Sequence, residues 1–137
     1  MIGVVLDINV VLDVFLSRSP WLTDSEAVVR AGIDGKVKTH ISAFSLLTIF
    51  YLVCRYADLA AAHVVVKKCL DSFEIVPVDR QTLEHAAGLP ASDFEDNLPI
   101  ACASHARLDA IVTRDPKGFA ASPVPVLSPT ELLARIS

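Results

Sequence analysis

The sequence predicts an α/β fold in which helices flank both faces of a parallel central sheet, a three-layer arrangement. Short apolar runs rich in valine and isoleucine alternate with longer segments of helical character, and this alternation is typical of strand–helix–strand units. The first run, Ile2–Leu6, is apolar except for its glycine, as expected of a strand buried on both faces of a parallel sheet. We expect a single domain over residues 1–137, since a chain of this length can bury a substantial core.

The first half of the chain continues with helices and one more strand. A short helix is expected over Asn9–Leu16, and Thr23 or Asp24 can cap a second helix that runs to Gly32. The elements that follow are a short strand and two long helices: Thr39–Ser42, Ala43–Tyr56 and Asp58–Ser72.

The second half repeats the alternation. Its expected elements are a third strand, two helices, a fourth strand and an edge strand: Phe73–Val76, Asp79–Ala87, Asp93–Arg107, Ala110–Thr113 and Pro123–Leu127. A terminal helix then has a clear start signal, with Ser128 as N-cap, Pro129 at the first helical position and Glu131 placed to complete a capping box.

Composition excludes several classes of protein. Apolar residues make up 53% of the chain and charged residues 20%, so the chain is not disordered. The net charge of −4 argues against binding nucleic acid through a broad basic face, although local basic patches or phosphates reached through a bound metal remain open. Arg114 and Lys117 flank Asp115, and we interpret each of them singly as ordinary solvated surface.

We expect no membrane association and a cytoplasmic location. The longest uncharged stretch, Ile41–Cys54, is too short to cross a bilayer as a helix, and the N-terminus has no signal-peptide pattern. The three cysteines are widely spaced and are expected to be free thiols of a cytosolic protein: Cys54, Cys69 and Cys102.

Carboxylates follow the predicted strands and begin a predicted helix. Asp7 comes directly after Ile2–Leu6, Asp115 follows the fourth strand, and Asp93 and Asp96 open a helix. The carboxyl ends of parallel strands meet at one edge of a sheet, where open α/β folds place their ligands. Converging carboxylates there suggest a site for a hard divalent cation.

Taken singly, each of these acids has a simpler structural explanation. Asp93 and Asp96 can cap a helix and complement its dipole, Asp7 can cap the short helix that follows it, and Asp115 can form a turn before proline. Asp13 can point either into the cleft or to solvent. The informative observation is therefore the combined pattern.

Four stretches, in order and spread over nearly the whole chain, resemble the motifs of PIN domains: Leu6–Asp13, Asp93–Asp96 with Ile100–Ala103, Ile111–Asp115 with Phe119, and Pro125–Glu131. The size of the chain is similar to that of small bacterial and archaeal PIN proteins, many of which are VapC-like toxins of toxin–antitoxin pairs.

The resemblance implies a ribonuclease that depends on Mg²⁺ or Mn²⁺. It implies that Asp7, Asp96 and Asp115 are both the catalytic residues and the metal ligands. It also implies an RNA substrate, a cognate antitoxin that covers the cleft, and a homodimer. Supporting roles fall to three further residues: Asn9, Asp93 and Thr113.

The sequence departs from the family pattern at two positions. Ile8 stands where a threonine or serine is usual, and Thr48 stands where most members have a glutamate, which resembles a branch of the family without that acid. The alternative is therefore a non-catalytic PIN-like module that binds RNA or a protein. A phosphohydrolase with Asp7 as nucleophile is disfavoured, because Asn9 stands where a second aspartate is usual.

Overall fold

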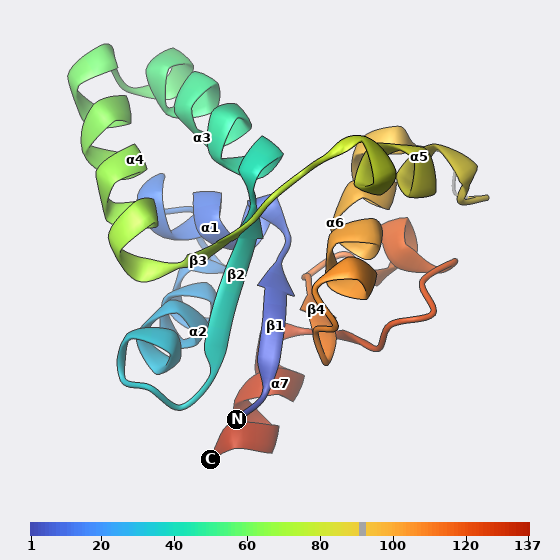
Figure 1. Cartoon of the computed structure of the whole chain (residues 1–137). Coiled ribbons are helices and arrows are strands. Elements are labelled where there is room, and N and C mark those ends of the chain that lie inside the picture. Colours follow the sequence, from blue (N-terminus) through green and yellow to red (C-terminus); the bar gives the residue numbers. More distant parts are fainter. Residues whose placement is uncertain (91–92) are drawn as a thin grey trace.

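The sheet in the computed structural model, which describes residues 1–90 and 93–137, contains parallel strands in the order β3-β2-β1-β4-β5 (Figure 1). Every pairing among these strands is parallel, which confirms the predicted architecture. The strands are β1 Gly3–Leu6, β2 Lys38–Ser42, β3 Glu74–Val76, β4 Ala110–Val112 and β5 Val126–Leu127.

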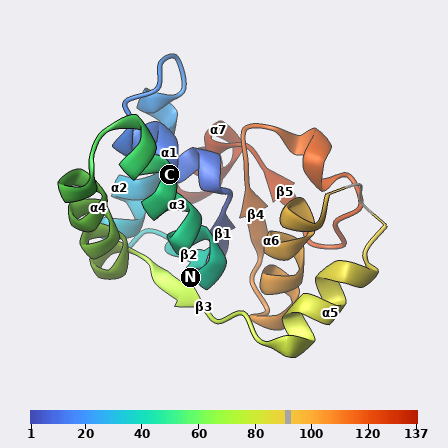
Figure 2. The same ribbon diagram turned by 90° about the horizontal axis from the view of Figure 1, so that it is seen from above.

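Helices cover both faces of this sheet, as Figures 1 and 2 show. On one face lie α1 Ile8–Phe15, α2 Leu22–Ile33, α3 Ala43–Tyr56, α4 Leu59–Ser72 and α7 Pro129–Ile136. On the other face lie α5 Arg80–Gly88, α6 Phe94–His105 and the short 3₁₀ helix η1 Pro116–Phe119.

The central strand β1 is buried on both sides, as its apolar run predicts. Val4 and Leu6 belong to the apolar cluster beneath α1 to α4, whereas Val5 packs with Ile100 of α6 on the opposite face. Successive side chains of a strand point to opposite faces, so a strand between two helical layers needs apolar residues at every position. The continuous apolar run therefore has a direct structural cause.

The register between β1 and β4 brings two polar residues together at one edge of the sheet. Leu6 pairs with Val112, and the backbone N–H of Asp7 donates to the carbonyl of Val112 at 2.8 Å. The residues that follow the two strands, Asp7 and Thr113, are therefore neighbours. The chain adds β2 and β3 on one side of β1 and then β4 and β5 on the other side. The switch in strand order therefore lies between β1 and β4, which is where open parallel sheets form a ligand crevice.

Local capping signals predicted several helix starts correctly. The side chain of Asp58 caps α4, that of Asp79 caps α5, and that of Asp93 caps α6. The capping box of Ser128 and Glu131 is present at the start of α7.

Two local expectations were wrong, and one element was not predicted. Helix α2 begins at Leu22 with Trp21 as its N-cap residue, so neither Thr23 nor Asp24 caps it. Helix α1 begins at Ile8, one residue earlier than expected, with Asp7 at the N-cap position but without a capping hydrogen bond from its side chain. The chain also forms η1 directly after Asp115, an element that the sequence analysis did not predict.

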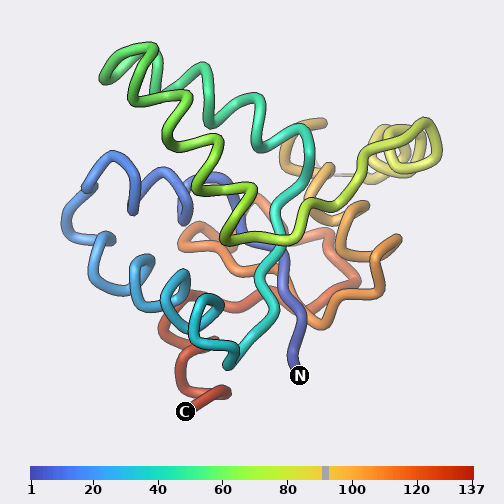
Figure 3. The backbone as a smooth tube through the Cα atoms, turned by 60° about the vertical axis from the view of Figure 1, so that its left-hand side comes forward, coloured from blue at the N-terminus to red at the C-terminus, as the bar shows by residue number. Residues whose placement is uncertain are grey.

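Helices α3 and α4 form an antiparallel pair that extends beyond the sheet (Figure 3). Large apolar side chains on this pair are exposed, including Leu47, Tyr51, Tyr56 and Leu59. In the described part of the chain, no helix has the length and apolar character needed to cross a membrane.

Candidate active site

Asp7 is the most deeply placed acid at the edge of the sheet. It is 9% exposed, and Thr113 Oγ1 donates a hydrogen bond of 2.9 Å to its Oδ2 atom. The backbone N–H of Asp115 donates in turn to Thr113 Oγ1 at 3.0 Å. One threonine hydroxyl thus connects the segments after β1 and β4 and fixes the orientation of the Asp7 carboxylate.

The pKa of Asp7 is raised, chiefly because burial removes water from its carboxylate, and the hydrogen bond from Thr113 counteracts part of this effect. A buried carboxylate is unfavourable unless a partner of opposite charge or a metal compensates it. The fold therefore compensates the charged form of Asp7 only in part.

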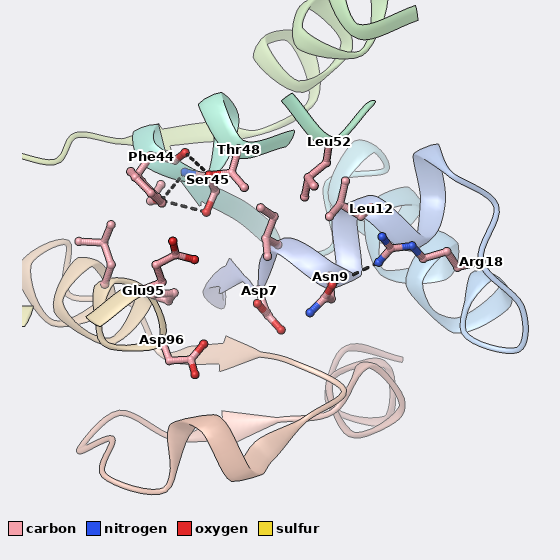
Figure 4. Close-up of a pocket in the computed structure, with 14 residues that line it drawn as sticks. Asp7, Asn9, Leu12, Arg18, Phe44, Ser45, Thr48, Leu52, Glu95 and Asp96 are labelled. Carbon is pink, nitrogen blue, oxygen red and sulfur yellow. Dashed lines mark hydrogen bonds between the residues drawn. The ribbon is translucent and has the colours of Figure 1, made fainter. Parts of the chain in front are cut away.

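Asp96 faces Asp7 from the other side of the cleft (Figure 4). It is the third residue of α6, whose N-cap is Asp93, as the sequence predicts. The pKa of Asp96 is raised, first by burial and then by the negative charges of Asp93, Asp7, Asp115 and Glu95. The predicted acids are thus close enough to repel one another.

Gly118 in η1 leaves room for the Asp96 carboxylate. A Cβ atom at position 118 would lie 3.3 Å from Asp96 Oδ2, which is tighter than ordinary van der Waals contact. The 3₁₀ helix after β4 therefore forms one wall beside Asp96, and the missing side chain of Gly118 is what allows this approach.

The cleft between α3 and α6 contains Asp7 and Asp96 together with other polar residues (Figure 4). Those polar lining residues are Asn9, Arg18, Ser42, Ser45, Thr48 and Glu95. Arg18 and Glu95 were not predicted as site residues: Arg18 stands in no motif, and Glu95 lies within the Asp93–Asp96 motif but was assigned no role there. Asp93, Thr113 and Asp115 lie beside the cleft and are not among its described lining residues.

Thr48 lies in the cleft, at the position where the sequence comparison expects the missing acid. Its hydroxyl donates to the backbone carbonyl of Phe44 one turn earlier at 3.4 Å, so it is occupied within its own helix. Beside it, Ser42 and Ser45 share a hydrogen bond of 3.0 Å between their hydroxyl groups. This wall of the cleft is therefore polar and uncharged.

The side chains, as they stand, do not form a closed metal cage. Among residues 1–90 and 93–137, no three His, Cys, Asp or Glu side chains lie close enough together to hold an ion between them. Mg²⁺, however, usually binds one or two carboxylates and keeps several waters. Burial and, after it, the negative charges of the neighbouring acids raise the pKa of Asp96, and a divalent cation would neutralise those charges, so the donor set fits such an ion.

Asp13 points neither into the cleft nor to solvent; it is buried. Its carboxylate accepts hydrogen bonds from Arg114 Nε at 2.9 Å, Arg114 Nη2 at 3.2 Å and Ser25 Oγ at 3.1 Å. Arg114 Cζ also lies 3.8 Å from the ring centre of Trp21. The interpretation of Arg114 as solvated surface was therefore wrong, because its guanidinium is bound on both sides.

The sequence profile of the PIN domain family matches residues 3–117, a span that includes every acid of the candidate site. The chain belongs to the PIN domain family. No curated protein sequence matches it significantly.

Solved structures of similar shape agree with the PIN fold. FitAcB from Neisseria gonorrhoeae is 21% identical, with a TM-score of 0.71 over 93% of this chain and 98% of that one. DNA-bound VapBC from Salmonella typhimurium is 16% identical, with a TM-score of 0.71 over 94% and 99%. VapC20 from Mycobacterium tuberculosis, described as a toxin that cleaves the sarcin-ricin loop, is 12% identical, with a TM-score of 0.70 over 86% and 94%. At these identities the likeness establishes the fold alone.

Proposed function

We propose that this PIN protein is a Mg²⁺- or Mn²⁺-dependent endoribonuclease. The observation that carries the proposal is the pair Asp7 and Asp96, which face each other across a polar cleft at the switch point of the sheet. Asp115 adds its negative charge from beside the cleft, since it contributes to the raised pKa of Asp96. We assign the metal-binding and catalytic roles to these three aspartates.

The reaction is hydrolysis of an RNA phosphodiester bond. Water attacks the phosphorus in line, the bond from phosphorus to the 3′-oxygen breaks, and the products carry a 5′-phosphate and a 3′-hydroxyl. A divalent cation, when bound, would supply charge neutralisation and an activated water.

The residues of the chain supply the orientation. Asp7 and Asp96 hold the two sides of the site, and Asp93 keeps the first turn of α6 in place by accepting a hydrogen bond from the N–H of Glu95 at 2.8 Å. Thr113 orients Asp7 through its hydroxyl, and Asn9 lines the cleft where it can position a water.

Cleavage of single-stranded RNA with and without Mg²⁺ or Mn²⁺ tests this proposal. Asp7→Asn and Asp96→Asn are each expected to lower the cleavage rate by about 100-fold or more, since metal ligands matter at least as much as the groups that orient them. Asp71→Asn, which changes an exposed acid on α4 in the same way, is the matched control and is expected to cleave normally. Equal cleavage by the wild type and both site variants would refute the assignment.

The wider biological role is a further part of the proposal. A structure described as a toxin–antitoxin complex from Klebsiella pneumoniae shares this fold at 21% identity, with a TM-score of 0.70. On this basis we infer that this chain is a single PIN domain, a cytoplasmic VapC-like toxin that a small antitoxin covers at the cleft. The exposed apolar side chains of α3 and α4 support a homodimer. Scattering or gel filtration that detected only monomer would count against the dimer.

The alternative is a PIN-like module that binds RNA or a protein without cutting RNA, in the branch of the family that lacks the second acid. Thr48 motivates it, since a hydroxyl occupied by the carbonyl of Phe44 adds no negative charge to the cleft. This alternative predicts that RNA binds and remains intact when Mg²⁺ or Mn²⁺ is supplied.

A further inference from the structure

Arg18 is the cationic residue among the described residues that line the acidic cleft. Its guanidinium lies on the far side of Asn9 from Asp7, as Figure 4 shows, and its side chain is 29% exposed. It shares the lining of the cleft with Asp7, Asp96 and Glu95, which together would repel the phosphates of an RNA strand. A cation at this position changes what the cleft can bind.

The position of Arg18 is fixed by its contacts with α1. Its Nη1 atom donates to Asn9 Oδ1 at 3.2 Å, and its backbone N–H donates to the carbonyl of Asp13 at 3.0 Å. Ser17, just before it, has a φ of 51°, a left-handed conformation that costs a residue with a side chain on the order of 1–3 kcal/mol. This turn directs Arg18 back along α1 toward the cleft.

Arg18 forms only a loose ion pair with its nearest acid. Its Nη1 atom lies 3.9 Å from Asp13 Oδ1, beyond hydrogen-bond distance, whereas Arg114 and Ser25 donate hydrogen bonds to that carboxylate. An arginine side chain has five N–H donors in a planar fork, and within the described residues only Asn9 accepts a hydrogen bond from the Arg18 side chain. The remaining donors suit the oxygens of a phosphate group.

We propose that Arg18 binds a phosphate of the RNA strand next to the bond that is cleaved, and that Asp13 is a positioning residue for it. This inference rests on the proposed ribonuclease function and names the group by which the acidic cleft holds its anionic substrate. The net charge of −4 argues against a broad basic face, so in this proposal a single arginine in the cleft supplies the positive charge that contacts the phosphate.

RNA binding across a series of salt concentrations tests the assignment, measured by fluorescence anisotropy in the Asp96→Asn background with Mg²⁺ so that the RNA remains intact. Arg18→Gln removes the charge and retains an amide N–H donor, on a shorter side chain. It is expected to weaken binding about tenfold and to reduce the slope of log affinity against log salt by about 0.7, the value for one phosphate contact on a single strand. Arg18→Lys is expected to retain the slope. Arg30→Gln, an exposed arginine on α2, is the matched control.

Unchanged affinity and slope in Arg18→Gln would overturn the phosphate contact, and so would equal losses in Arg18→Gln and Arg18→Lys with the slope unchanged. Either result leaves the proposed function intact if the wild type still cleaves RNA. A wild type that cleaves no RNA in the cleavage assay refutes the ribonuclease itself.

The positioning role of Asp13 is tested separately by a double-mutant cycle. Asp13→Asn is expected to weaken RNA binding, and much less so when Arg18 is already glutamine. Additive losses would refute the positioning role.

Discussion

The buried pair of Asp13 and Arg114 gives a sharp prediction about stability. Asp13→Asn preserves the shape of the side chain and removes its charge, so Arg114 loses its ionic partner. The pair has two hydrogen bonds, at 2.9 and 3.2 Å, and the Asp13 side chain is fully buried whereas that of Arg114 is 22% exposed. The substitution therefore leaves the Arg114 guanidinium without its nearest negative charge at the edge of the core.

The magnitude follows from this geometry. Breaking a fully buried ion pair costs about 3–5 kcal/mol. Arg114 can still reach water through its exposed fraction, so we expect Asp13→Asn to lower the free energy of unfolding by about 2–3 kcal/mol. For a chain of this size, that corresponds to a fall in Tm of roughly 10 °C.

Urea unfolding measures the change as a shift of the midpoint at constant m-value. The double variant Asp13→Asn with Arg114→Gln closes a cycle, and the coupling energy between the two residues is expected to be about 2 kcal/mol. Asp71→Asn on α4 should stay within about 0.5 kcal/mol of the wild type. A loss below about 1 kcal/mol for Asp13→Asn would refute the view that this pair ties α1 to the segment after β4.

Four further predictions concern the cleft itself. The pKa of Asp96 is raised, so its charged form destabilises the fold, and the free energy of unfolding should fall as pH rises through that raised pKa. Asp96→Asn should remove this fall and raise the Tm at neutral pH by the equivalent of about 0.5 kcal/mol. Mg²⁺ should raise the Tm of the wild type but not that of Asp96→Asn, and more so at higher pH, where protons compete less. Thr48→Glu should tighten Mn²⁺ binding about tenfold, measured by calorimetry, because it adds a carboxylate to the cleft. Gly118→Ala should slow cleavage about tenfold with little loss of stability, because its Cβ would displace Asp96; unchanged kinetics would show that Asp96 tolerates the shift.

Local sequence signals were sufficient for much of the fold. Helix α3 has the predicted bounds Ala43–Tyr56, and the cap at Asp93 and the capping box at Ser128 are formed as expected. These features depend on residues a few positions apart, and the strand–helix alternation then restricts the topology to a parallel sheet. The neighbourhood of Asp7 and Thr113 followed from that topology.

Features that depend on long-range packing could not be predicted in this way. Asp13 and Arg114 are 101 positions apart, and no periodicity connects them. Trp21 begins α2 at a position where no side-chain cap is formed, and it stacks against that same arginine. Arg18 belongs to no motif and gains its place in the cleft only because a left-handed residue turns the chain back along α1.

The three-aspartate site is tested most directly by calorimetric titration of the apo protein with Mn²⁺. We predict that the wild type binds Mn²⁺ in the millimolar range or more tightly, and that Asp7→Asn and Asp96→Asn each weaken this binding while Asp71→Asn does not. The absence of any binding to the wild type at millimolar Mn²⁺ would contradict a metal-dependent ribonuclease and favour a PIN-like module that binds without cutting.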